Sequence, residues 1–215
     1  SVTLIEANED SFESLRSRKP EIVFNIAEGR FGASREAQIP AILEMLNIPY
    51  TGSDPLTLGI CLDKSRAKEI LSHYHIANPE FTVVSSLSEL QSLDFPVPAI
   101  VKPLFEGSSK GIFNSSLVHS SKELVEQIQK VLEEYNEPAL IEEFLPGREF
   151  TVAMLGNGDD LQVLPIVEIK FDSLPQGVNP IYSYEAKWIW DQSSNPLEIF
   201  ECPAKIDSHL KTAIA

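Results

Sequence analysis

The stretch over residues 98–111 constrains the fold of this chain more than any other. The apolar run Pro-Ala-Ile-Val-Lys-Pro predicts a strand that ends near Lys102, and the loop Glu-Gly-Ser-Ser-Lys-Gly follows at once. A cation at the end of a strand, followed by small residues whose N–H groups can approach an anion closely, is a pattern that suits polyphosphates. The lysine precedes the glycines, and the sequence has no G-x-x-x-x-G-K-[ST] motif. The pattern therefore predicts a phosphate-handling loop that is not a P-loop.

The composition argues against several kinds of partner. The 215 residues carry a formal net charge of −15, whereas nucleic-acid binding needs a broad positive face, so we expect no nucleic-acid partner. The sequence shows no apolar run of membrane-span length and no signal pattern at its start, which predicts no membrane association and a cytoplasmic location. Cys61 and Cys202 lie far apart without C-x-x-C spacing, so we expect free, buried thiols rather than a disulfide or a zinc site.

The first part of the chain, residues 1–55, predicts a partial domain. Residues 2–6 and 20–26 have the apolar pattern of strands, and a helix is expected between the cap Ser34 and Asn47. Strand, helix and strand in this order favour a small doubly wound α/β layer.

The remainder predicts a central region over 56–143 and a partial C-terminal region over 144–215. In the central region Asp63 should cap a helix that carries Lys64, Arg66 and Lys68 on its polar side. Its inward side chains should be Ile70, Leu71 and Tyr74. Further elements are predicted as strands at 81–84 and 99–102, a long helix after Ser120, and a β hairpin that turns at 156–159.

Several charged residues stand at the ends of these predicted elements. Taken singly, a lysine at a strand end is usually solvated, and paired glutamates such as Glu142 and Glu143 usually flank an exposed edge. Their order is more informative than any one of them. Lys64 starts a helix, Lys102 ends a strand before the Gly-Ser loop, a Glu-Glu-Phe-Leu segment follows the long helix, and Glu149 opens the next strand.

This ordered set resembles the ATP-grasp superfamily and, within it, the D-alanine–D-alanine ligases. Five segments carry the resemblance: I-P-Y-T-G-S from residue 48, L-D-K-S-R-A-K from 62, V-K-P and E-G-S-S from 101 and 106, L-I-E-E-F-L-P-G-R-E-F-T-V from 140, and Y-E-A-K from 184. The resemblance implies an α/β fold (α+β in part), in which the N-terminal layer is followed by an ATP-grasp fold of two antiparallel β layers with helices. ATP would lie between the two layers.

On the phosphate side, the resemblance implies five residues. Lys64 and Lys102 would contact phosphate oxygens, where a fixed cation neutralises charge as the γ-phosphoryl group leaves. Ser108 and Ser109 would lie over the phosphates as a closing loop, and Lys187 would reach the transferred phosphoryl group from a second loop. Ser108 and Lys187 are the candidate catalytic residues.

On the adenosine side, the resemblance implies five more. Glu142 would receive the adenine amino group, the backbones of Glu143 and Leu145 would pair with the base edge, and Phe144 would pack on its face. Glu149 would bind the ribose hydroxyls, which suits a carboxylate that only accepts hydrogen bonds.

The implied reaction is the two-step synthesis of D-alanyl-D-alanine or a similar dipeptide for cell-wall (peptidoglycan) precursors. A substrate carboxylate takes the γ-phosphoryl group of ATP to form an acyl phosphate, and an amine then displaces phosphate. The expected partners are small amino acids. Dimers are common in the family, so a homodimer is an open expectation.

Two departures from the family pattern shape the prediction. The family's magnesium-binding segment, an aspartate followed by Glu-x-Asn, should lie beyond Ala215, so Mg²⁺ is expected in the full-length enzyme with its ligands absent from this chain. The glycine-rich opening of the family is also missing, and we expect an internal fragment that is inactive or nearly so alone. Trp188 stands where the family commonly has tyrosine, which leaves open an ATP-grasp ligase for a different amino acid pair. A non-catalytic ATP-binding module is the alternative from another class.

Overall fold

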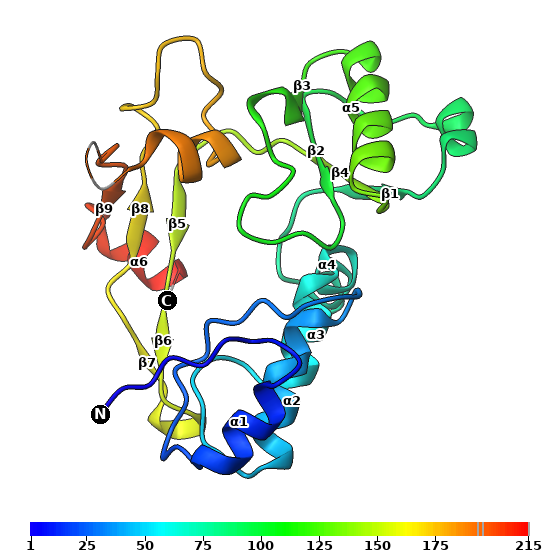
Figure 1. Ribbon diagram of the computed structural model, residues 1–215. Helices are drawn as coiled ribbons and strands as arrows, with labels where there is room; N and C mark the ends of the chain where they lie inside the picture. Colours follow the sequence, from blue (N-terminus) through cyan, green and yellow to red (C-terminus); the bar gives the residue numbers. More distant parts are fainter. Residues whose placement is uncertain (193, 195, 215) are drawn as a thin grey trace.

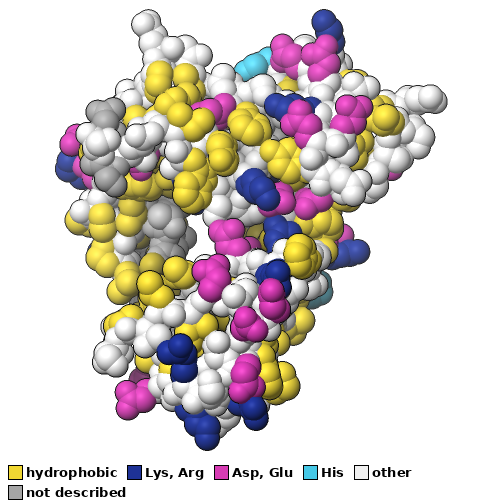
Figure 2. All heavy atoms as spheres, in the orientation of Figure 1, with side chains coloured by type: hydrophobic (Ala, Val, Ile, Leu, Met, Phe, Trp, Pro, Cys, Tyr) yellow, Lys and Arg dark blue, Asp and Glu magenta, His cyan; other side chains and the backbone are white. Residues whose placement is uncertain are grey.

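The structure, a computed structural model, describes residues 1–192, 194 and 196–214. Figure 1 shows three groups of elements: N-terminal helices at the bottom, a sheet covered by a long helix at the upper right, and a second sheet at the left. Figure 2 shows that the molecule is hollowed between these groups, with charged side chains along the hollow.

The N-terminal group consists of helices around a small apolar core. Leu15, Leu43 and Ile48 form this core. Its elements are α1 (Ser11–Arg18), η1 (Arg35–Ala37), α2 (Gln38–Met45) and α3 (Pro55–Leu62). The helix predicted after Ser34 is thus a 3₁₀ turn followed by an α-helix, and it ends before Asn47, whose φ of 51° breaks the helical path.

The strands predicted for this region are almost absent from the described residues. Residues 2–6 form no strand, so that prediction was wrong, and 20–26 contribute a single parallel bridge between Val23 and Tyr50. A strand needs a neighbour to satisfy its backbone groups, and the described chain offers one residue of pairing here. The outward side chains of Ile22, Phe24 and Ile26 accordingly remain 61–80% exposed.

The central group is a four-stranded antiparallel sheet in the order β1-β4-β2-β3, and α5 packs on it. Its core combines apolar side chains from the strands with the inner face of α5, including Val101, Ile128 and Ile141. Its elements are β1 (Phe81–Val84), η2 (Leu87–Ser92), β2 (Ala99–Pro103), η3 (Asn114–Ser116), β3 (Leu117–Val118), α5 (Ser121–Glu134) and β4 (Ala139–Glu143). The predicted cap of the long helix is present, because the Ser120 hydroxyl accepts a hydrogen bond from the Glu123 N–H.

Helix α4 (Lys64–His73) begins at the predicted cap, and Arg66 is exposed as predicted, but three other side chains lie on the opposite side from the one expected. The Asp63 side chain accepts from the N–H groups of Ser65 and Arg66. Lys68, however, is only 7% exposed, while Ile70 is 41% and Tyr74 69% exposed. The prediction that Lys68 faces solvent was wrong because a buried carboxylate, described below, compensates its charge.

The C-terminal group is a three-stranded antiparallel sheet, β5-β8-β9, with a β6-β7 hairpin. The hairpin turns at the predicted place, where a Cβ on Gly156 would lie 2.4 Å from the carbonyl oxygen of Asp160. The elements are β5 (Glu149–Thr151), β6 (Met154–Leu155), η4 (Gly158–Asp160), β7 (Gln162–Val163), β8 (Val167–Ile169), η5 (Glu185–Trp190), β9 (Phe200–Glu201) and α6 (Ser208–Ile214). The two antiparallel sheets agree with the predicted fold class.

Two smaller findings complete the fold. Cys61 and Cys202 are both exposed, so the expectation of buried thiols was wrong, although both are free. Across the described residues, no helix has the combination of length and apolar character that a bilayer span demands.

Candidate functional site

The floor of the candidate site is a buried carboxylate held by two lysines. Lys102 on β2 and Glu142 on the neighbouring β4 are diagonal neighbours, because Glu142 pairs with Ile100 in the antiparallel register. The Lys102 Nζ lies 2.5 Å from Glu142 Oε2, and the Lys68 Nζ of α4 lies 3.1 Å from Glu142 Oε1. Two cations share one anion, so the floor carries a net positive charge.

The titration of Glu142 is governed by opposing effects. Burial raises the pKa of its carboxyl, but the charges and hydrogen bonds of Lys102 and Lys68 outweigh burial, and the net pKa is lowered. The carboxylate is therefore ionised at neutral pH and fixes both ammonium groups. This arrangement holds Lys102 at the end of β2, directly before the phosphate loop.

The first residues of that loop, 104–106, form a base in which all three carbonyl oxygens and the N–H groups of Leu104 and Phe105 have hydrogen-bond partners. Lys64 donates to the carbonyl oxygens of Pro103 at 3.2 Å, Leu104 at 2.9 Å and Glu106 at 2.5 Å. An ammonium group has three donors, so all of them are in use. The Phe105 N–H donates to Glu137 Oε2 at 3.0 Å. The base is thus held by side chains from two other elements.

The environment of Lys64 also changes its titration. Burial lowers the pKa of Lys64 to about 8, and the nearby charge of Lys102 adds to the effect. Lys64 was predicted to contact phosphate. In this structure its donors face the loop backbone, so its predicted phosphate contact would require a change of partners.

The next residues, 107–109, form the tip of the loop, where the carbonyl oxygens accept hydrogen bonds but the N–H groups are free within the described residues. Ser108 and Ser109 have φ angles of 52° and 60°, in the left-handed region that L-residues seldom adopt. Within the described part of the chain, the N–H groups of Gly107, Ser108 and Ser109 donate to no acceptor. Free N–H groups on consecutive residues of a turn are donors that can bind an anion.

The tip is held by side chains on either side of it. The Ser108 hydroxyl donates to Glu28 Oε1 at 2.7 Å, and the Ser109 hydroxyl donates to the Tyr182 carbonyl oxygen at 2.8 Å. The Trp188 indole N–H donates to the Ser108 carbonyl oxygen at 2.9 Å. These contacts stabilise the strained backbone and leave its N–H groups open.

The second predicted loop is a single π-helical turn, η5, beside the tip. Lys187 lies on this turn, with its Nζ 5.6 Å from the Trp188 ring centre and 6.0 Å from that of Tyr182. The Tyr184 N–H donates to the Ile112 carbonyl oxygen at 2.6 Å, which joins the turn to the phosphate loop. Lys187 therefore lies on a helical turn rather than an open loop, and its approach to a phosphoryl group stays a prediction.

The residues predicted to hold adenosine follow Glu142 along the chain. The N–H groups of Glu143 and Phe144 already donate to the carbonyl oxygens of Glu80 and Pro98. A base edge paired to Glu143 would therefore use its carbonyl. Leu145 is 58% exposed, and among the described residues its N–H has no acceptor. Partial desolvation raises the pKa of Glu149, and Lys102 opposes this rise.

Three residues of the site were missed by sequence reasoning. Lys68 anchors Glu142, Glu137 holds the loop base, and Arg35 contacts the loop from the N-terminal group. Only Lys68 left a readable signal, because Lys64 and Lys68 are separated by four residues and so share one face of a helix.

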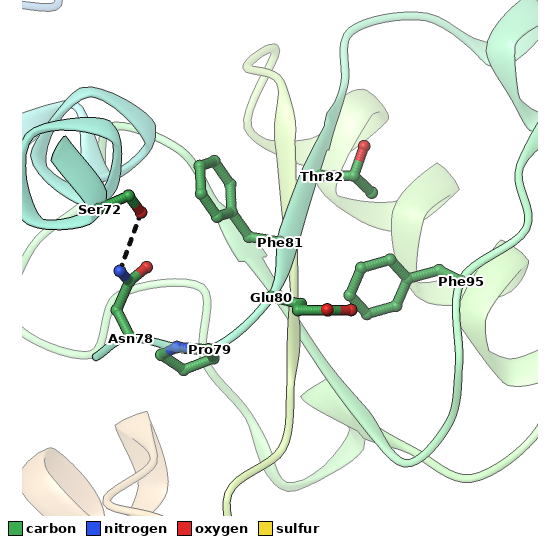
Figure 3. Close-up of a pocket in the computed structure, with 7 residues that line it drawn as sticks. All are labelled: Ser72, Asn78, Pro79, Glu80, Phe81, Thr82 and Phe95. Carbon is green, nitrogen blue, oxygen red and sulfur yellow. Dashed lines mark hydrogen bonds between the residues drawn. The ribbon is translucent and has the colours of Figure 1, made fainter. Parts of the chain in front are cut away.

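A further hollow lies outside β1, next to the floor: Phe81 lines it, and the same residue pairs with Glu142 in the sheet. Figure 3 shows it between Phe95 and the hydrogen bond that joins Ser72 to Asn78. Its lining comes from β1, which is an edge strand of the central sheet, and from the segments beside it. Among the described residues no three His, Cys, Asp or Glu side chains gather to hold a metal ion, so this part of the chain does not fit the Mg²⁺ that the family implies.

Two antiparallel sheets, a cationic floor and a loop with free N–H groups define an ATP-grasp protein. Residues 73–215 match the family described as D-ala D-ala ligase C-terminus. The chain belongs to this family.

Two curated relatives cover most of this chain, and one of them is a named ligase. A D-alanine–D-alanine ligase of Bordetella petrii is 30% identical over 214 residues, which cover 99% of this chain and 60% of the relative. An uncharacterized protein of Sinorhizobium fredii is 36% identical over 92% of this chain and 55% of its own length. The chain therefore spans a little over half the length of these relatives.

Solved structures show the same fold. The VanG D-Ala:D-Ser ligase of Enterococcus faecalis superimposes with a TM-score of 0.65 at 26% identity, over 90% of this chain and 53% of that one. A D-alanine–D-alanine ligase of Bacillus anthracis complexed with ATP gives a TM-score of 0.63 at 23% identity, over 96% of this chain and 60% of that one.

Proposed function

We propose that the chain is the nucleotide-binding part of an ATP-dependent ligase that joins D-alanine to D-alanine, or a similar pair, through an acyl phosphate. One observation carries this proposal: the buried set of Lys102, Glu142 and Lys68 lies at the entrance to a loop whose tip offers free N–H groups. A polyphosphate would meet there a fixed cation and three free backbone donors.

The proposed roles follow the chemistry of each group. Lys102 would neutralise charge as the γ-phosphoryl group passes to the substrate carboxylate and ADP leaves. The N–H groups at 107–109, with the Ser108 and Ser109 side chains, would cover the phosphates. Lys187 would reach the transferred group from η5. The amine would then attack the acyl carbon, and inorganic phosphate would depart with the bonding electrons.

The adenosine end would lie along the residues after β4. Glu142 can accept from the adenine amino group with lone pairs that its two lysines leave free. Glu143 and Leu145 would pair with the base edge, Phe144 would pack on its face, and Glu149 would accept from the ribose hydroxyls. The partition into regions 1–55, 56–143 and 144–215 is part of the same proposal.

The substrate pair is the finer part of the proposal. The named relatives include D-alanine–D-alanine ligases and a D-Ala:D-Ser ligase. A ligase for a different amino acid pair is the alternative, and Trp188 supports it. The indole N–H donates to the loop, but unlike the tyrosine hydroxyl common in the family it cannot also accept a hydrogen bond. Cell-wall precursor synthesis in the cytoplasm by a homodimer is the setting that this family membership supports.

A non-catalytic ATP-binding module is the second candidate. It is favoured by the finding that the described residues gather no metal ligands. Such a module would bind ATP through the same floor and loop without releasing phosphate.

Phosphate release by the full-length protein separates these candidates. The assay compares D-alanine alone with D-alanine paired to D-serine and to a panel of other amino acids, with ATP and Mg²⁺ supplied. Release with D-alanine alone supports the leading proposal, and release only with another pair supports the alternative ligase. ATP binding without release under any pair supports the module. Lys102→Ala should abolish release, and Lys122→Ala, on an exposed face of α5, should not.

A further inference from the structure

We propose that Arg35 is a positioning residue that sets the affinity of the site for the outer phosphates of the nucleotide. The inference rests on the proposed function, because it assigns to Arg35 the task of placing the loop that would hold those phosphates. Arg35 itself lies in the N-terminal group, outside every segment that carries the resemblance to the ligases.

The contact joins parts of the chain that are 70 residues apart. The Arg35 Nη2 donates to the Phe105 carbonyl oxygen at 2.8 Å and lies 3.1 Å from Glu106 Oε2. The two charged side chains are only 16% and 12% exposed. A pair so withdrawn from solvent is screened much less than a surface pair such as Arg66 with Glu69, whose side chains are 65% and 52% exposed.

Arg35 is itself held in place. It begins η1, which packs against α3, and its N–H donates to the Gly32 carbonyl oxygen at 3.2 Å. The backbone of Gly29 lies so close that an added Cβ would be 1.9 Å from the Arg35 carbonyl oxygen, and its φ of +74° also favours glycine. The guanidinium therefore projects from a rigid turn.

Glu106 links this turn to the rest of the loop. Its carboxylate also receives Lys110 at 3.1 Å, and its carbonyl oxygen accepts from Lys64. Removal of the Arg35 guanidinium would leave these two contacts in place. The loop would then stay folded at its base but lose its attachment to the N-terminal turn, and the tip at 107–109 would be less well placed.

Loss of the Arg35 guanidinium should weaken binding of the outer phosphates selectively. Arg35 has no contact with Glu142, Leu145 or Glu149, which would hold adenosine, among the contacts of the described chain. The loss should therefore fall on ATP and spare AMP, whose recognition would depend on the adenosine residues. A general loosening of the fold would weaken both nucleotides alike.

The test is calorimetric binding of ATP and AMP to the full-length protein and its variants. Arg35→Met should weaken ATP binding about tenfold, as expected for a charge-assisted hydrogen bond, and AMP binding less than twofold. Arg35→Lys, which keeps the charge but lacks the fork of donors, should lie between. The exchange Arg35→Glu with Glu106→Arg should recover part of the ATP affinity. Arg66→Met is the matched control and should change neither constant.

Each other outcome overturns a particular statement. Equal losses for ATP and AMP would make Arg35 a structural residue, and unchanged ATP affinity in Arg35→Met would remove the inference while leaving the proposed function intact. If the wild-type protein bound no ATP, the proposed function and this inference would both fall. Should Arg35→Met not fold, Arg35→Lys and the exchanged pair still give the comparison.

Discussion

The base and the tip of the phosphate loop are adjacent in sequence but opposite in construction. At the base, residues 104–106, backbone groups are bound by Lys64, Arg35 and Glu137. At the tip, residues 107–109, the side chains are engaged while the N–H groups have no acceptor within the described residues. A rigid base beneath an open tip is what preorganised anion binding requires, because the donors need no reorganisation when the ligand arrives.

The contrast also separates stability from affinity. Buried backbone groups that lose a partner destabilise the fold, whereas free N–H groups contribute nothing to folding and much to ligand binding. Changes at the base should therefore lower both the free energy of unfolding and the affinity for ATP. Changes at the tip should lower affinity alone.

The largest effect is expected from Lys102→Ala, at the floor below the base. We expect ATP affinity to fall about 100-fold, because the variant removes a fixed cation beside the phosphates and leaves buried Glu142 with one lysine instead of two. Calorimetric titration measures the affinity. Lys122→Ala, whose side chain is 85% exposed, is the control. Equal affinities in both variants would move the phosphate site elsewhere.

Lys64→Met tests the base itself. Three carbonyl oxygens would lose their donor, which should lower the free energy of unfolding by about 2 kcal/mol after the relief of a buried charge is counted. Urea unfolding measures this change, with Lys122→Met as the matched control. A variant as stable as the wild type would mean that the base is not held by Lys64.

The pH dependence of ATP binding sharpens the same point. Because the pKa of Lys64 is lowered to about 8, its positive charge is present below that pH and is lost as the pH rises above it. If phosphate binding uses that charge, ATP affinity should fall up to about tenfold per pH unit above 8. Lys64→Arg, which stays charged, should give a flat profile between pH 7 and 9. A wild-type profile as flat as that of Lys64→Arg would exclude Lys64 from phosphate binding.

The smallest effect is expected at the tip. Trp188→Phe removes one hydrogen bond to the Ser108 carbonyl oxygen, which is worth about 1 kcal/mol, or about fivefold in ATP affinity. The midpoint of unfolding should stay near that of the wild type, because Trp188 is 54% exposed. A large loss of stability with unchanged affinity would reverse the assignment of base and tip.

The central sheet and its long helix could be predicted because their signals are local. The apolar run of β2 and the cap at Ser120 require no knowledge of distant residues, and both elements are present. The strands expected near the N-terminus depended instead on partners, and only the Val23–Tyr50 bridge formed. A period-two pattern predicts a face, but it cannot supply the neighbour that makes a strand.

The residues of the candidate site also fall into those that local motifs identify and those that only long-range contacts identify. Lys102, Ser108 and Lys187 stood in motifs and could be chosen from sequence, although their roles remain predictions. Arg35 and Glu137 act on the loop from 70 and 32 residues away, through contacts that no spacing rule describes. Lys68 was assigned to solvent because a lysine is rarely buried, and the exception arose from a carboxylate on another element.

Amide hydrogen exchange over residues 104–109, with and without ATP, tests the central claim most directly. Without nucleotide, the base amides of Leu104 and Phe105 should exchange slowly, since both are hydrogen-bonded, and those of Gly107, Ser108 and Ser109 should exchange fast. Addition of ATP should slow the three tip amides and leave the base unchanged. If ATP left the tip amides fast and instead slowed those around the hollow at 78–82, this account of the phosphate site would be contradicted.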